Sequence, residues 1–306
     1  MSRRVTVLMG GASAERAVSL NSGAAAARAL ERAGYAVTVL DIGRDPAQLA
    51  RRIGESKPDV VFNALHGRFG EDGCVQGLLN MMGLPYTHSG LLASAAAMDK
   101  AFSRRIFAAS DIPVAAGKVV RKGEIEGDPL PRPYVVKPLN EGSSVGVHIV
   151  RAGDDRSPLT DWPFDGDRVL VEEFVPGREI TVAVLGGRAL GALEITSDRG
   201  FYDYEAKYAP GGSRHLMPAP LAKADYDEAC RLAEEAHRVL GCRGVTRTDL
   251  RYDDTVPGRP PRLLVLEINT QPGMTDTSLV PEIAAHAGMD FPALVHWMVE
   301  NAACDG

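Results

Sequence analysis

The chain has 306 residues, of which 45% are hydrophobic and 24% charged, and 40 acidic side chains outnumber 34 basic ones for a net charge of −6. This composition excludes a mainly disordered, collagen-like or coiled-coil architecture, and the length predicts two or three domains. The acidic balance argues against a nucleic-acid partner. No apolar run reaches the ~18 residues of a membrane span. The apolar run nearest the N-terminus, at residues 5–9, is too short for the core of a signal peptide. The four cysteines are scattered without metal-site or disulfide spacing. We therefore expect a cytoplasmic protein with reduced thiols.

The first region, predicted as residues 1–95, alternates short apolar strands with helices. Strands are expected at 4–9, 36–41 and 60–63, and helices from an N-cap at Ser13 to about residue 33 and over 46–54. This alternation predicts a parallel, Rossmann-like sheet. In such sheets ligands bind at the carboxyl ends of the strands, so we expect the loops 10–15 and 65–73 to border a site.

The rest of the chain reads as two β-rich regions, expected at residues 96–176 and 177–306. In the earlier one, a helix over 99–110 precedes strands at 116–120, 134–138, 147–150 and 169–173. The later one has strands at 179–185, 190–195, 245–252 and 263–269, with helices at 223–240, 278–287 and 292–301. A polar loop at 197–214 is longer than structureless connections usually are, so either it contains further structure or it has a function.

Two pairs of polar side chains lie at two of these predicted strands. Glu267 alternates with Asn269, and Arg247 alternates with Asp249. Residues two apart share one face of a strand. If the two strands pair antiparallel, Asp249, Glu267 and Asn269 converge, and two carboxylates with one amide oxygen suit Mg²⁺. The alternative is that these are surface carboxylates at strand ends, with Asn269 forming a turn.

A glycine-rich segment, NEGSSVG at residues 140–146, lies between two predicted strands. Its backbone and hydroxyl donors suit a polyphosphate, and Lys137, on the strand that enters it, suits phosphate charge. The alternative is a flexible hairpin tip. No Walker A or GxGxxG motif is present, and Ser143 lacks the GxSxG context of a serine hydrolase.

Two further residues lie in the loops that follow the N-terminal strands. Glu15 either anchors a cationic substrate group or only favours the helix dipole. His66 either serves the same site or is a satisfied loop histidine. The histidines show no metal-ligand spacing, which argues against a histidine-based metal centre.

Several segments, in order and spanning residues 4–300, resemble the D-alanine–D-alanine ligases. They are VLMGGASAERAVSLNSG (7–23), ALHGRFGEDGCVQG (64–77), LPYTHSG (84–90), AMDK (97–100), VVKPLNEGSSVGV (135–147), EITVAVL (179–185), FYDYEAKY (201–208), TRTDL (246–250) and LEINTQPGMTDTSLVP (266–281). The resemblance implies an α/β chain with an ATP-grasp fold, in which two α+β subdomains close on ATP, preceded by a Rossmann-like substrate domain.

The resemblance also implies a role for each polar residue above. For ATP it implies Lys100, Lys137, Glu172, Glu173, Phe174 and Glu179, and for two Mg²⁺ ions, with Mn²⁺ as an alternative, it implies Asp249, Glu267 and Asn269. The first D-alanine is implied at Glu15, Ser143 and Tyr208, with His66 near its carboxylate. The oxyanion donors are implied to be Arg247 and the backbone of Gly273, and Lys207, Ser278 and Leu279 to meet the γ-phosphate and the second D-alanine.

The implied reaction makes D-alanyl-D-alanine for peptidoglycan precursors through a D-alanyl phosphate, with 140–146 and 197–214 as lids. A cytoplasmic homodimer with no nucleic-acid or membrane partner is implied as well. One alternative is a D-alanine–D-lactate ligase, against which the neutral Tyr208 argues, because a cationic side chain there would favour lactate. Another is a non-catalytic nucleotide-sensing protein on the same fold, against which the complete metal-ligand set argues. Gln271 stands where many relatives carry a small or apolar residue.

Overall fold

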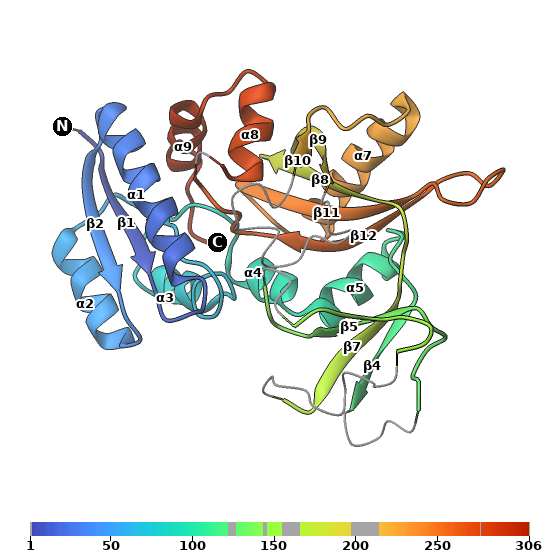
Figure 1. The fold of residues 1–306 in the computed structure, drawn as a ribbon. Coiled ribbons are helices and arrows are strands. Elements are labelled where there is room, and N and C mark those ends of the chain that lie inside the picture. The colour runs from blue at the N-terminus through green and yellow to red at the C-terminus, as the bar shows by residue number, and fades with distance from the viewer. Residues whose placement is uncertain are drawn as a thin grey trace.

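The computed structural model describes residues 2–121, 127–142, 146–154, 166–196, 214–275 and 277–305. In this described part of the chain, three β-sheets follow one another, and helices pack between and around them (Figure 1). Within the described residues, no helix combines the length and the apolar character needed to cross a membrane.

The N-terminal sheet is parallel and has the strand order β2-β1-β3, as predicted. Its strands are β1 (Arg4–Gly10), β2 (Ala36–Ile42) and β3 (Val60–Asn63), and the helices of this region are α1 (Arg16–Arg32), α2 (Pro46–Ser56), α3 (Cys74–Met81) and α4 (Leu91–Met98). The two helices α3 and α4 have no counterpart among the predicted elements. Both are short, with eight residues and no side-chain cap, and α4 is almost entirely apolar, so it lacks the periodic pattern that indicates a helix.

The predicted N-cap of α1 at Ser13 is wrong, since the helix begins at Arg16. The hydroxyl of Ser13 donates to the backbone carbonyl of His66 over 2.7 Å and accepts from the backbone N–H of Glu15. A contact that is distant in sequence therefore takes the place of the local cap. It joins the loops that follow β1 and β3 at the carboxyl edge of the sheet.

The middle sheet is antiparallel and has the order β4-β7-β5-β6. Its strands are β4 (Gly117–Arg121), β5 (Tyr134–Pro138), β6 (His148–Val150) and β7 (Arg168–Glu173), and α5 (Lys100–Ala109) precedes them. Asp99 caps α5 by accepting from the N–H of Phe102. The strands β5 and β6 pair antiparallel on either side of the glycine-rich segment, as expected for a hairpin.

The third sheet is antiparallel and has the order β10-β9-β8-β11-β12. Its strands are β8 (Arg178–Leu185), β9 (Arg188–Thr196), β10 (Arg214–Leu216), β11 (Val245–Asp253) and β12 (Arg262–Asn269), and its helices are α7 (Lys223–Val239), α8 (Leu279–His286) and α9 (Phe291–Glu300). On β8, Val182 packs in the core beneath α7, whereas Ala183 packs in the core with α8. Because both faces of the sheet are covered here, residues 182–185 of β8 form a continuous apolar run rather than an alternating one.

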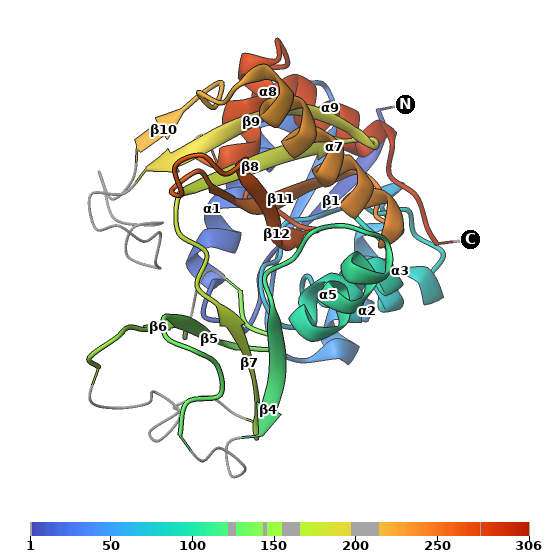
Figure 2. The same ribbon diagram turned by 90° about the vertical axis from the view of Figure 1, so that its right-hand side faces the viewer.

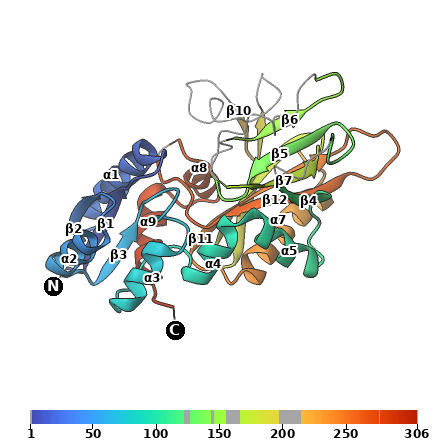
Figure 3. The same cartoon turned by 90° about the horizontal axis from the view of Figure 1, so that it is seen from below.

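The C-terminal helices connect the first and third sheets (Figure 1). A single core contains Val7 and Phe62 of the N-terminal sheet together with Ile283 of α8 and Val295 of α9. The middle sheet has a small core of its own around Tyr134 and stands apart from the N-terminal sheet (Figures 2 and 3). The division at residues 95/96 and 176/177 stays a prediction.

Candidate active site

Two adjoining cavities lie where the three sheets meet. The larger, of about 340 Å³, is lined by residues that include Glu15, His66, Arg247, Asn269, Gly273, Ser278 and Leu279. The smaller, of about 80 Å³, is lined by residues that include Lys137, Glu172, Glu173, Phe174, Glu179 and Asp249. Lys100, Glu141 and Glu267 line both. Every predicted site residue in the described part of the chain therefore borders one cavity or the other.

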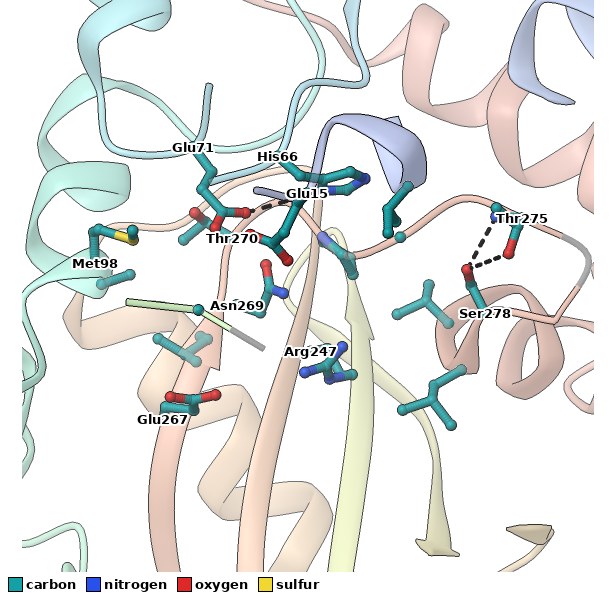
Figure 4. Close-up of a pocket in the computed structure, with 18 of the residues that line it drawn as sticks. Glu15, His66, Glu71, Met98, Arg247, Glu267, Asn269, Thr270, Thr275 and Ser278 are labelled. Carbon is teal, nitrogen blue, oxygen red and sulfur yellow. Dashed lines mark hydrogen bonds and ion pairs between the residues drawn. The ribbon is translucent and has the colours of Figure 1, made fainter. Parts of the chain in front are cut away.

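The strands β11 and β12 pair antiparallel, which was the condition for their polar side chains to converge. Asp249 lies opposite Glu267, and Arg247 lies opposite Asn269. Cross-strand neighbours share a face of the sheet, so all four side chains project to one side. Figure 4 shows Arg247, Glu267 and Asn269 directed into the larger cavity.

The two carboxylates on this face, those of Asp249 and Glu267, are each paired with a cation. The guanidinium of Arg247 donates from Nε and Nη2 to the two oxygens of Asp249, over 2.9 and 2.7 Å. Lys100 Nζ lies 3.1 Å from Oε2 of Glu267 and donates to the backbone carbonyl of Glu141. The positive charges of Arg247 and Lys100 are therefore balanced by the carboxylates of Asp249 and Glu267.

The smaller cavity contains a buried charged group that sequence reasoning identified only in part. Glu172 is 2% exposed and pairs with both Lys137 and Arg104. Arg104 was not among the predicted residues, because its place on α5 shows no link in sequence to the strand that carries Glu172. Its Nη2 also donates to the carbonyl of Ala115, which ties α5 to the start of the middle sheet.

The donor set fits Mg²⁺. No cluster of three or more His, Cys, Asp or Glu side chains forms a metal cage within the described ranges. Asp249, Glu267 and Asn269 instead offer a few oxygen donors at an open cavity. Mg²⁺ characteristically binds one or two carboxylates and fills its other positions with water and phosphate oxygens.

At the N-terminal end of the larger cavity, Glu15, His66 and Glu71 lie together (Figure 4). Nδ1 of His66 is 4.0 Å from Oε2 of Glu71. Burial, and next the charge of Glu15, raises the pKa of Glu71 to about 8, and burial lowers the pKa of His66. Both pKa shifts favour the neutral form of the side chain.

Glu71 is a site residue that sequence reasoning missed. It lies in the loop 65–73, which was expected to border a site, but nothing in the spacing separates it from Asp72 beside it. At Gly67 this loop lies close to the loop that follows β1. The φ of Gly67 is +68°, and a Cβ on it would lie 2.7 Å from the Cβ of Ser13. Only glycine allows this approach, which brings Glu71 toward Glu15.

The opposite end of the larger cavity is formed by the segment that leads into α8. The hydroxyl of Ser278 accepts from the backbone N–H of Thr275 over 3.0 Å and lies 2.8 Å from its hydroxyl (Figure 4). A Cβ on Gly273 would lie 2.9 Å from Ser278 Oγ. The close contact brings the Gly273 backbone to the cavity wall.

Three predicted residues, Ser143, Lys207 and Tyr208, lie outside the described residues, as do residues 143–145 of the first predicted lid and 197–213 of the second. Their assignments stay predictions.

Comparison with known proteins agrees with this arrangement. The family models for the N-terminus and the C-terminus of the D-ala D-ala ligases match residues 44–89 and 106–300. The chain is 74% identical over 306 residues to the D-alanine–D-alanine ligase of Paramagnetospirillum magneticum, and 58% identical over 308 residues to that of Rhodospirillum rubrum, with 100% of each chain covered. A crystal structure of D-alanine–D-alanine ligase from Bacillus anthracis complexed with ATP matches with a TM-score of 0.83 and 28% identity, over 98% of this chain and 97% of that chain.

Fold and site together define an ATP-grasp ligase. Within that class, the chain belongs to the D-alanine–D-alanine ligase family.

Proposed function

We propose that this chain joins two molecules of D-alanine into D-alanyl-D-alanine and converts ATP to ADP and phosphate, for peptidoglycan precursor synthesis. The observation that carries the proposal is the face of β11 and β12 at the junction of the two cavities. It presents Arg247, Asp249, Glu267 and Asn269 together. Phosphoryl transfer needs such an array of metal ligands and cations between a nucleotide and an acceptor.

In this proposal the smaller cavity receives the nucleotide. Glu172, Glu173 and Phe174 border the adenine, and Glu179 the ribose, while Lys100 and Lys137 turn from their carboxylate partners to the phosphates. Asp249, Glu267 and Asn269 would hold two Mg²⁺ ions, or Mn²⁺. The metal would neutralise phosphate charge and orient the γ-phosphoryl group.

The larger cavity receives the two D-alanines. Glu15 pairs with the ammonium of the first, together with Ser143 and Tyr208, and His66 lies near its carboxylate. Lys207, Ser278 and Leu279 meet the γ-phosphate and the carboxylate of the second.

The chemistry then proceeds in two steps. A carboxylate oxygen of the first D-alanine forms a bond to the γ-phosphorus, and the bond from that phosphorus to ADP breaks. The amine of the second D-alanine attacks the acyl carbon, loses a proton, and phosphate departs with the carbon–oxygen bonding pair. Arg247 and the backbone N–H of Gly273 donate to the oxyanion between these events. The pair with Asp249 fixes the plane of the Arg247 guanidinium.

The proposal places the reaction in the cytoplasm, where ATP is made, and all four cysteines are free thiols. We also propose that the chain is a homodimer through its N-terminal region. Sedimentation at assay concentration tests this directly.

Glu15→Gln tests the substrate end of the proposal. A neutral amide pairs less strongly with an ammonium than a carboxylate does, so we expect the KM for D-alanine to rise at least about tenfold. The KM for ATP should stay within about twofold, because Glu15 does not border the smaller cavity. Initial rates of phosphate release at varied D-alanine and ATP measure both.

Glu31→Gln, an exposed position on the same helix, is the matched control and should change neither constant. An equal rise in both constants for Glu15→Gln would instead indicate that Glu15 stabilises the start of α1.

A further inference from the structure

Gln271 is almost completely buried but lines neither cavity. It is 1% exposed and lies between Asn269 and Gly273, both of which border the larger cavity. Its side chain is directed toward the loop that follows β3 and not into the larger cavity. That loop carries His66 and Glu71.

The amide of Gln271 bonds to this loop through both of its ends. Its Nε2 donates to the backbone carbonyl of Leu65. Its Oε1 accepts from Nδ2 of Asn63 over 2.9 Å and from Nε2 of Gln76 over 3.4 Å. Asn63 and Gln76 also both donate to the carbonyl of Gly70, over 3.0 and 2.9 Å. Three buried amides thus hold the two ends of the loop, next to His66 and next to Glu71.

The same residue holds one of the proposed metal ligands. The backbone N–H of Gln271 donates to Oδ1 of Asn269 over 2.8 Å. A second connection runs parallel to the first: Ser22, buried on α1, accepts from the N–H of Met274 over 3.2 Å, and its hydroxyl lies 3.3 Å from Nε2 of His66. Of these contacts, only the Gln271 side chain spans from the Asn269–Gly273 turn to the backbone of the loop itself.

A buried polar network whose members are satisfied by one another specifies one arrangement of the segments that it joins. Glutamine combines the length with the donor and the acceptor that these bonds need. A small or an apolar side chain lacks this combination. Without this glutamine, the Leu65 carbonyl and the Asn63 amide would each lose one partner in a buried part of the chain. The loop would then shift to find others.

We propose that Gln271 is a positioning residue. It fixes the loop that bears His66 and Glu71 at a set distance from Asn269 and Gly273. It thereby fixes the position of the first D-alanine's binding site relative to the proposed metal ligands and to the donors for the oxyanion. The identity of that substrate rests on the proposed function. The connection between the two segments does not.

The test uses Gln271→Ser, which keeps the backbone N–H bond to Asn269 and removes the side-chain bonds. The KM for the first D-alanine should rise about tenfold and kcat should fall, because loss of a positioning contact misplaces the bound substrate. The KM for ATP should stay within about twofold, since neither Gln271 nor its partners border the smaller cavity. Gln271→Met, of similar length but without hydrogen bonds, should behave as Gln271→Ser does.

The control for general destabilisation is Leu232→Ala, on the buried face of α7, which should lower the melting temperature without separating the two KM values. Hydrogen exchange without ligands supplies a readout that does not depend on activity. In Gln271→Ser, exchange should quicken in peptides covering 63–76 and 269–275 and stay unchanged in α7.

Unchanged exchange in those peptides would overturn the proposal. So would quickened exchange with an unchanged KM for D-alanine, since Gln271 would then tie the loop without serving the site. If the wild-type chain releases no phosphate with D-alanine and ATP, the proposed function fails. The exchange experiment then decides alone whether the connection exists.

Discussion

Glu267→Gln is expected to lower the rate of D-alanyl-D-alanine formation by about three orders of magnitude while leaving the fold intact. Glu267 borders both cavities, lies opposite Asp249 and pairs with Lys100. A neutral amide is a weaker metal ligand than a carboxylate, and its loss of charge also removes the partner that balances Lys100. Phosphate release at saturating ATP, D-alanine and Mg²⁺ measures the effect, and thermal melting reports the fold.

Glu235→Gln is the matched control, because Glu235 pairs with Arg238 on the outer face of α7, away from both cavities. It should retain full activity. Turnover in Glu267→Gln close to that of the wild type would remove Glu267 from the metal site.

Arg247→Ala is expected to lower kcat by about 10²–10³, the usual effect of removing one oxyanion donor. The guanidinium lines the larger cavity, and its orientation is fixed by the two bonds to Asp249. Its donors are needed most when negative charge develops on the acyl oxygen, that is, during peptide formation rather than phosphoryl transfer.

The two half-reactions can be separated. Scrambling of an oxygen-isotope label between the βγ-bridge and the non-bridging positions of ATP, in the presence of D-alanine, reports formation and reversal of the acyl phosphate. In Arg247→Ala this scrambling should fall by less than about tenfold while peptide formation falls by the full factor. Equal loss of both would mean that Arg247 acts through Asp249 and the metal rather than on the oxyanion. Arg251→Ala, which removes another arginine of the same strand, should not separate the two half-reactions.

Four strands of the third sheet, β8, β9, β11 and β12, could be predicted because their signals are local, whereas the short edge strand β10 was not among the predicted strands. Alternation placed Arg247 with Asp249 and Glu267 with Asn269, and a pairing of two strands was enough to bring the pairs together. The parallel N-terminal sheet followed in the same way from alternating strands and helices.

The features that escaped prediction depend on contacts between distant segments. Ser13 looks like a helix cap, but its hydroxyl is taken by the carbonyl of His66, 53 residues away. The pKa of Glu71 is raised only because the fold buries it beside Glu15. In the sequence, Gln271 differs from the small or apolar residue of many relatives, but nothing indicates its partners. These partners are 206 and 208 residues away in the chain. Patterns of residue spacing describe local structure and do not predict contacts between segments so far apart in the chain.

The packing of α8 and α9 against the first sheet also depends on contacts between distant segments and was not predicted. A helix was predicted at 292–301, but not that its buried side chains would share a core with Val7 and Phe62. That shared core joins the substrate end of the larger cavity to the strands that carry the proposed metal ligands.

The central claim is that the chain makes a peptide from two D-alanines. The most direct measurement is the mass of the product after incubation at pH 7 with ATP, Mg²⁺, D-alanine and an excess of D-lactate, with a parallel incubation in which L-alanine replaces D-alanine. We expect D-alanyl-D-alanine as the dominant product, one phosphate released per peptide, little ester, and no product from L-alanine. A dominant D-alanyl-D-lactate peak would make the chain a D-alanine–D-lactate ligase, and ATP binding without any condensed product would make it a nucleotide-sensing protein; either result would contradict the account.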